Sequence, residues 1–240
     1  MEPKQLQFAL GNLHDCDYLP GRSAQSAFLI ADRENPSNEY ANLIQYGFRR
    51  SGDWVYRPHC PACQSCIPVR VRVEQFAKSR KQKRIWEKNA DLRVQRKAPL
   101  FDRNHYDLYQ RYLNARHPGG AMSLSGPEEY IEFLGSHWAE TAFYEFRLDG
   151  RVVLVAVVDD IGHALSAVYT FFDPDFTQRS LGGYAILWEI EQSLNFGYRY
   201  LYLGYWISEC RKMAYKTEYR PIEVLVDGQW RLINSEKIVV

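Results

Sequence analysis

YTFFDPDFTQRSLGGYAILWEIEQ, residues 169–192, is the segment around which the chain is built. Residues 168–172 are β-branched and aromatic, which predicts a half-buried strand. The sequence DPD at residues 173–175 ends that strand because proline cannot donate a hydrogen bond to a strand ladder. A helix is expected to begin at Ser180, so the stretch passes from a strand through a turn into a helix.

The start of this helix has the chemistry of an anion site. The Ser180 hydroxyl can cap free backbone N–H groups, and Gly182 and Gly183 leave the backbone bare. Such N–H groups attract anionic oxygens, so a phosphate is a candidate ligand. Plain packing of the strand against the helix is the competing interpretation. The apolar face of the helix is marked by Leu187, Ile190 and Leu194.

The composition is that of a globular protein with a substantial core. The chain has 240 residues, of which 46% are hydrophobic and 25% charged, so it can form one large domain or two smaller ones. Residues 1–15 have no basic start followed by a long apolar run, and no segment reaches about eighteen consecutive apolar residues. We therefore expect a cytoplasmic protein with no membrane partner.

The first part of the chain mixes short elements. Residues 69–73, VRVRV, alternate and predict a strand with one basic face. The other elements expected here are short strands at residues 8–13 and 26–31, a helix at 37–46 closed by Gly47, a hairpin turn at 51–53 and a strand at 54–57.

A strongly basic run follows at residues 78–97, KSRKQKRIWEKNADLRVQRK. It has nine basic and two acidic residues, a net charge of +7. A solvated helix face followed by a linker would also have this composition. Because the run follows the basic strand, we favour a polyanion partner such as an RNA backbone.

From about residue 102 the pattern becomes regular. Helices are expected at residues 103–115 and 128–135, a three-strand meander at 141–148, 151–158 and 163–172, a helix at 181–196, and strands at 198–206, 222–226 and 229–233. Antiparallel strands, a helix with a phosphate-suited start and another strand are the order of the GNAT-like acyl-CoA N-acyltransferase architecture. The expected fold class is therefore mixed α/β (α+β), with a GNAT-like domain in residues 98–240 preceded by a smaller cysteine-containing domain in residues 1–97.

The sequence CPACQSC places three thiols at spacings suited to one metal centre. CxxC loops bind zinc, and CxxCxxC binds iron–sulfur clusters. The alternative is that reduced, buried cysteines hold loops together. The candidate ligands are Cys60, Cys63 and Cys66, with Cys16 as the fourth and His14 and His59 in reserve.

A second basic group lies in and beside KMAYKTEYRP, residues 212–221. Arginine binds carboxylate and phosphate as a fork and lysine binds them as a point charge, so an anionic partner is expected; a charged surface loop is the alternative. The cations are Arg211, Lys212, Lys216 and Arg220.

Five blocks of this sequence together resemble the aminoacyl-tRNA–protein transferases, and within them the short bacterial branch of aspartate/glutamate leucyltransferases. The blocks are CDYLPGR at 16–22, GFRRSGDWVYRPHCPACQSCIPVRV at 47–71, FAKSRKQKR at 76–84, YTFFDPDFTQRSLGGYAIL at 169–187 and KMAYKTEYRPIE at 212–223. The longer eukaryotic branch transfers arginine and has a CxxC plus an adjacent cysteine pair. Here Leu19 stands where the second cysteine of the CxxC would fall, so no metal is carried over from that branch.

The resemblance implies transfer of an aminoacyl group from a tRNA 3′ end to the N-terminal amine of a protein that begins with Asp or Glu, which marks that protein for degradation in the N-degron pathway. The ester is already activated, so no cofactor is required for the transfer. Catalysis then consists of positioning, deprotonation of an amine of pKa about 8, and stabilisation of an oxyanion.

The same resemblance assigns candidate roles to the residues singled out above. For the general base we name Tyr169, Asp173 and Asp175. For the donor and its tRNA we name Arg80, Lys81, Lys83, Arg84, Arg179, Ser180, Leu181, Gly182 and Gly183. For the acidic acceptor we name Arg211, Lys212, Lys216 and Arg220.

Three alternatives stay open. The donor can be arginine instead of leucine, because the preference for leucine rests on the branch that the chain resembles. A small-molecule N-acetyltransferase would need only the second domain, and an RNA-binding module built on the cysteines would need no catalysis.

Overall fold

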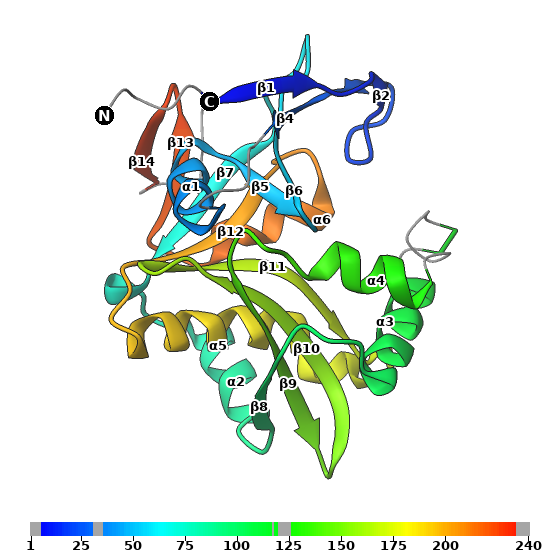
Figure 1. Ribbon diagram of the computed structural model, residues 1–240. Helices are drawn as coiled ribbons and strands as arrows, with labels where there is room; N and C mark the ends of the chain where they lie inside the picture. The colour runs from blue at the N-terminus through cyan, green and yellow to red at the C-terminus, as the bar shows by residue number, and fades with distance from the viewer. Residues whose placement is uncertain (1–5, 31–35, 117, 120–125, 234–240) are drawn as a thin grey trace.

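The computed structural model describes residues 6–30, 36–116, 118–119 and 126–233, and has two main sheets with helices around them (Figure 1). The small sheet has the strand order β1-β4-β6-β5 and lies in the upper part of the view. Its strands are β1 (Gln7–Leu10), β4 (Ser26–Ile30), β5 (Arg49–Ser51) and β6 (Trp54–Pro58), and a separate pair is formed by β2 (His14–Asp15) and β3 (Ser23–Ala24).

The large sheet has the strand order β14-β13-β7-β12-β11-β10-β9-β8, and it includes strands from both ends of the chain. Its strands are β7 (Ile67–Arg72), β8 (Arg93–Lys97), β9 (Glu140–Leu148), β10 (Arg151–Asp160), β11 (Ala164–Phe172), β12 (Tyr200–Trp206), β13 (Ile222–Val226) and β14 (Gln229–Ile233). Because β7 and β8 belong to this sheet, the expected domain boundary at residue 97 does not separate two sheets.

The expected meander and hairpins are confirmed. β9, β10 and β11 pair antiparallel in sequence order. Asp149 and Gly150 both have positive φ, as do Asp227 and Gly228, which is the geometry of two-residue turns that match strand twist.

The helices surround the large sheet. α5 (Leu181–Asn195) and α2 (Arg80–Lys88) lie below it in Figure 1, and α1 (Pro36–Leu43) lies above with the small sheet. α3 (Arg103–Arg116) and α4 (Pro127–Leu134) confirm two predicted helices, and the short α6 (Arg211–Ala214) follows β12. Gly47 ends the helical segment after α1 at φ 85, as expected. None of the helices described here has the length and apolar character needed to cross a membrane.

The core is divided by the large sheet. On one side, residues of α5 such as Leu187 and Ile190 pack on β-strand residues such as Val71 and Leu201. On another, Leu113 of α3 and Leu134 of α4 pack with Phe171 and other residues of the meander. This packing holds β11, the turn after it and α5 in place, which is the predicted strand-to-helix stretch.

Candidate active site

The site is built where two parallel strands separate. β11 and β12 pair through only three residues each, from Ala164 with Tyr200 to Ser166 with Tyr202. Beyond these residues β11 pairs with β10, and β12 pairs with β7. The β12–β7 register shifts between Tyr202 and Gly204, and Gly204 has φ 75, which is how a bulge redirects a strand. The result is a wedge in the sheet, open beyond Ser166.

Arg49 of β5 extends into this wedge from the small sheet. Its Nη1 donates to Ser166 Oγ at 2.8 Å and its Nη2 donates to the Ala167 carbonyl at 2.5 Å. A Cβ atom at Gly204 would lie 3.5 Å from Arg49 Nε. Arg49 is only 8% exposed, so the small sheet supplies a buried cation at the point where the ladder ends.

The N-terminus of α5 lies at the end of the turn that follows β11. Its first backbone N–H groups have no partner within the helix, and the helix dipole favours an anion there. The predicted cap is wrong: Ser180 is the N-cap residue, but its backbone is left-handed (φ 52) and its side chain makes no capping bond. A Cβ at Gly182 would be 2.9 Å from the Phe172 ring, and one at Gly183 would be 3.5 Å from the Tyr219 hydroxyl.

The three residues predicted as the base lie in environments that disfavour proton transfer. Asp173 is fully buried and accepts hydrogen bonds from Arg111 and Arg151. Asp175 is exposed and pairs with Arg111. Burial raises the pKa of Tyr169 far above its usual range. Asp173 therefore fixes the turn between β11 and α5 through its two arginines.

Arg179, predicted to bind the donor, is paired within the protein. Its two Nη atoms each donate to Asp91 at 2.8 Å, and Nη1 also reaches the Lys88 carbonyl at 3.0 Å. The structure therefore assigns it to tying the turn before α5 to the end of α2.

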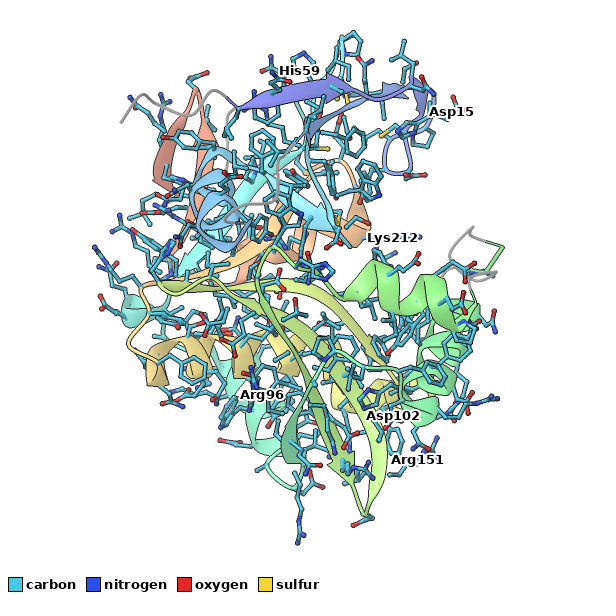
Figure 2. The ribbon with its side chains drawn as sticks, in the orientation of Figure 1. Asp15, His59, Arg96, Asp102, Arg151 and Lys212 are labelled. Atoms are coloured by element: carbon cyan, nitrogen blue, oxygen red, sulfur yellow. The ribbon has the colours of Figure 1, made fainter. Side chains whose placement is uncertain are left out.

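The four cations predicted to hold the acceptor do not form one group. Arg211 and Lys212 are exposed on α6, and Lys212 lies well above Asp102 and Arg151 in Figure 2. Lys216 is 7% exposed, and its Nζ donates to the Tyr205 carbonyl at 2.6 Å. Burial, together with Arg49, lowers the pKa of Lys216 to about 7. Arg220 Nε donates to the Thr217 carbonyl.

The two arginines of the predicted basic face at residues 69–73 share one carboxylate inside the sheet. Arg70 Nε and Arg72 Nε donate to the two carboxylate oxygens of Glu223 at 2.7 and 2.5 Å. The arginines face β13, which the local pattern could not reveal.

The exposed positive charge is on α2. Ser79 caps this helix in a capping box with Gln82, and Arg80, Lys83 and Arg84 are exposed on it. Lys81 pairs with Glu218 at 2.9 Å. Arg80, Lys83 and Arg84 are thus the residues of the predicted basic run on α2 best placed to meet a polyanion.

The cysteines predicted as ligands lie near the start of β7 and the end of β12. Cys16, Cys63 and Cys66 pack with Leu19, Ile207 and Cys210, and the Arg22 Nη1 donates to Cys63 Sγ at 3.4 Å. Cys60 donates to the Gln25 carbonyl. Four cysteine sulfurs are a ligand set that suits a tetrahedral metal. Burial and the neighbouring cysteines raise the pKa of Cys66 to about 12, and no three sulfur atoms in the described residues lie within 4.8 Å of one another.

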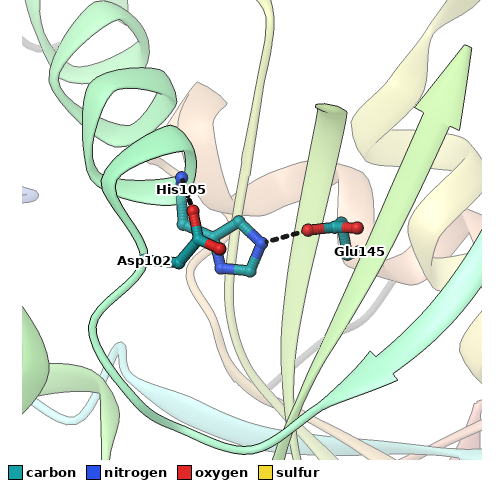
Figure 3. A group of neighbouring side chains, drawn as sticks. All are labelled: Asp102, His105 and Glu145. Atoms are coloured by element: carbon teal, nitrogen blue, oxygen red, sulfur yellow. Dashed lines mark hydrogen bonds and ion pairs between the residues drawn. The ribbon is translucent and has the colours of Figure 1, made fainter. Parts of the chain in front are cut away.

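Asp102, His105 and Glu145 form a second group of potential metal ligands (Figure 3), with one ligand atom from each residue within 4.8 Å of the others. Asp102 accepts from the backbone N–H groups of Asn104 and His105 and so caps α3. His105 Nε2 lies 2.7 Å from Glu145, which also accepts from Arg147. These contacts account for both carboxylates, so we interpret the group as a tie between α3 and β9.

Glu189 is a residue of the site that the sequence patterns missed. It lies on α5, is fully buried, and neither of its carboxylate oxygens has a hydrogen-bond partner among the described residues. Burial raises its pKa to about 8, and Arg49 opposes this effect. The available signal was its position in LWEI, a glutamate between apolar residues of a helix that is buried on most sides.

Relatives with curated names cover almost the whole chain. "Aspartate/glutamate leucyltransferase" of Pseudomonas fluorescens strain Pf-5 is 47% identical over 97% of this chain and 99% of its own length. The proteins of the same name from Pseudomonas aeruginosa strain PAO1 and Alcanivorax borkumensis are also 47% identical, over 95% and 94% of this chain and 97% and 93% of their own.

Solved structures are more distant. The L-PGS of Bacillus licheniformis matches with a TM-score of 0.48 at 12% identity, over 60% of this chain and 48% of that chain. FemX matches with a TM-score of 0.47 at 8% identity, over 83% of this chain and 79% of that chain.

Two family descriptions match most of the chain between them. "Arginine-tRNA-protein transferase, N terminus" matches residues 14–84, and "Arginine-tRNA-protein transferase, C terminus" matches residues 104–226. The second match contains the wedge, the start of α5 and Glu189, and the first contains Arg49 and the cysteines. The chain belongs to the arginine-tRNA-protein transferase family.

Proposed function

We propose that the protein transfers leucine from leucyl-tRNA to the N-terminal amine of proteins that begin with Asp or Glu. The near full-length identity to proteins named aspartate/glutamate leucyltransferase supports this substrate choice. The observation that carries the site is the wedge between β11 and β12, which opens beside the N-terminus of α5. In this proposal the large sheet is a GNAT-like aminoacyltransferase core.

The donor binds with its terminal phosphate at the start of α5. The backbone N–H groups of Leu181, Gly182 and Gly183 face the anion, and the aminoacyl ester extends into the wedge. The exposed cations of α2, Arg80, Lys83 and Arg84, contact the tRNA backbone.

The reaction is an exchange of an ester for an amide. The neutral acceptor amine attacks the ester carbonyl, the carbon–oxygen bond to the tRNA breaks, and an amide forms. The acceptor ammonium loses two protons in total, one before attack and one after it, and the departing 3′ oxygen takes up one. Because the ester is activated, positioning and oxyanion stabilisation supply the catalysis.

The acceptor's acidic side chain binds to cations near the end of β12. Arg211 and Lys212 are exposed and available, whereas Lys216 donates to the Tyr205 carbonyl. We therefore assign the acceptor carboxylate to the first two.

The choice of leucine over arginine rests on the identity to proteins named leucyltransferases. An arginine donor would need a free carboxylate for its guanidinium. Asp159 and Asp173 already bind arginines, so among the buried carboxylates of the described residues only Glu189 is open to such a side chain, and the comparison with arginyl-tRNA tests it.

The decisive experiment supplies labelled leucine, tRNA, leucyl-tRNA synthetase and a peptide that begins with Asp or Glu. We expect label in these peptides and not in matched peptides that begin with Asn or Gln. A parallel reaction with arginyl-tRNA tests the donor, and one with acetyl-CoA tests a small-molecule N-acetyltransferase. Transfer that survives RNase treatment of the charged tRNA, or RNA binding without transfer, would refute the proposal.

A further inference from the structure

Five carboxylates are buried in the described residues, and four of them are paired. Asp159 binds Arg50, and Asp173 binds Arg111 and Arg151. Glu145 binds His105 and Arg147, and Glu223 binds Arg70 and Arg72. The fifth, Glu189, has no hydrogen-bond partner for either oxygen.

An unpaired buried carboxylate is costly. Moving an ionised carboxylate out of water without a partner costs several kcal/mol or forces the group to take up a proton. The raised pKa of Glu189 is the expected response. A leucine of similar size would avoid the cost, so a glutamate here is explained by a ligand that pairs with it.

Glu189 lies close to the proposed donor site. It is eight residues from Leu181, so it lies about 12 Å along the axis of α5 from the helix start. Its electrostatic neighbours are Arg49, in the wedge, and the phenols of Tyr215 and Tyr219. Tyr219 itself reaches the first turn of α5, where its hydroxyl donates to the Gly183 carbonyl at 3.4 Å.

The separation matches the donor. Between the terminal phosphate of an aminoacyl-tRNA and its α-amine lie the ribose, the ester and one Cα atom, a span comparable with two to three extended residues, roughly 7–11 Å. With the phosphate at the helix start, this span falls a few ångström short of the Cα of Glu189. The Glu189 side chain covers the remaining distance, because side chains on an α-helix tilt toward its N-terminus.

We propose that Glu189 binds the α-ammonium group of the aminoacyl donor and thereby selects donors whose amine is free. The inference rests on the proposed function. An ammonium offers three donors, enough to satisfy both carboxylate oxygens, and Arg49, which has no acceptor, cannot take this role. The acceptor amine is a poor candidate, because an ion pair with Glu189 would keep it protonated and unable to attack.

The test compares leucyl-tRNA with N-acetyl-leucyl-tRNA as donors for an Asp-initiated peptide. Acetylation removes the positive charge and leaves the ester and the side chain unchanged. We expect the wild type to prefer the free amine by roughly 10- to 100-fold in kcat/KM, the range for hydrogen bonds between charged groups. Glu189→Gln should lose most of this preference, with the loss confined to leucyl-tRNA.

The matched control is Glu191→Gln, two residues further along α5. Glu191 is partly exposed and pairs with Lys78 at 2.7 Å, so this change should leave the preference intact. Equal losses with both donors in Glu189→Gln would overturn the proposal, as would an unchanged preference or a wild type that does not discriminate.

A binding experiment separates this inference from the proposed function. The probe is adenosine 5′-phosphate with leucine in a stable 3′-amide, with its α-amine free or acetylated. Calorimetry should show tighter binding of the free amine to the wild type and equal binding of both probes to Glu189→Gln. Binding of the free-amine probe to the wild type should release a proton, because pairing with the ammonium group ionises Glu189. If the wild type binds the free-amine probe more tightly but transfers no leucine to peptides, only the proposed function is refuted. If it transfers leucine but binds both probes equally, only the role of Glu189 is refuted.

Discussion

Arg50 and Asp159 join the small sheet to the large one through two hydrogen bonds of 2.6 Å, and both side chains are fully buried. Arg50 also donates to the Leu134 and Gly135 carbonyls at the end of α4. One guanidinium therefore fixes three parts of the fold, and its neighbour Arg49 enters the wedge from the same strand.

Removing the Arg50 guanidinium should destabilise the folded protein strongly. Arg50→Ala leaves Asp159 buried without its partner, and we expect a loss of about 3–5 kcal/mol in the free energy of unfolding. Arg50→Lys should recover little, because lysine cannot replace a bidentate fork. Urea denaturation measures both. The control is Arg103→Ala in the exposed pair with Asp107, for which at most about 1 kcal/mol is expected; a similar loss in both variants would contradict the interpretation.

The two glycines of α5 should respond differently to alanine. In Gly182→Ala the new Cβ meets the Phe172 ring at 2.9 Å, so we expect a loss of about 1–3 kcal/mol and weaker donor binding as the helix start shifts. In Gly183→Ala the nearest atom to the new Cβ is 3.5 Å away. This change should leave stability unchanged or raise it by up to about 1 kcal/mol, because alanine has a better helix propensity than glycine. Thermal unfolding of the pair distinguishes them, and equal effects would count against the packing argument.

Glu189 should make stability depend on pH. Its pKa is about 8 in the folded protein and near 4.5 when unfolded, so between these values the folded state keeps a proton that the unfolded state has lost. Stability from this group is present below pH 4.5 and falls as pH rises to about 8, by at most about 1.4 kcal/mol per pH unit. Glu189→Gln should therefore gain stability relative to the wild type as pH rises from 5 to 8.

The measurement is the difference in unfolding free energy between these two proteins at each pH. Lys216, with a pKa lowered to about 7, titrates in both proteins and cancels. Glu191→Gln is the control, and a difference that is flat with pH would show that Glu189 is already ionised in the fold.

Salt dependence should identify the tRNA surface. Replacing Lys83 and Arg84 by glutamine removes two exposed cations of α2. The negative slope of the logarithm of the tRNA association constant against the logarithm of the salt concentration should become shallower by about 1.4–1.8. Filter binding across a salt series measures this slope. Arg231→Gln, which removes an exposed cation of β14 that pairs with Asp227, is the control. An unchanged slope in the α2 variant would move the RNA contact elsewhere.

The cysteine group should bind one metal centre per chain if the metal draws its four sulfur atoms closer together than they lie in this structure. Anaerobically purified protein would then contain about one zinc ion or show an iron–sulfur absorption band. Cys63→Ser should lose the metal, whereas Cys210→Ser should retain it. If the wild-type protein is folded and contains no metal, these cysteines have only a packing role.

The local elements of this protein could be predicted from short stretches of its sequence. The turns at Asp149-Gly150 and Asp227-Gly228, the helix end at Gly47 and the passage from β11 to α5 follow from residues that are neighbours in the chain. Backbone sterics and hydrogen-bond periodicity act over a few residues, so such signals are readable without the fold. The five quoted blocks also carried the family resemblance, since the family is recorded in residue identity.

Which charged side chains are free depends on contacts between segments that are far apart in the sequence. The sequence pattern predicts a basic face with Arg70 and Arg72, but both side chains bind the carboxylate of Glu223, about 150 residues away, in the sheet. Arg49 reaches the wedge only because the small sheet packs on the large one, and Glu189 is unpaired only because of what surrounds α5. Burial and pairing depend on contacts between distant segments, and no local period encodes these contacts. The stretch at residues 169–192 thus specified a strand, a turn and a helix, whereas the fold made its buried glutamate a candidate for binding substrate.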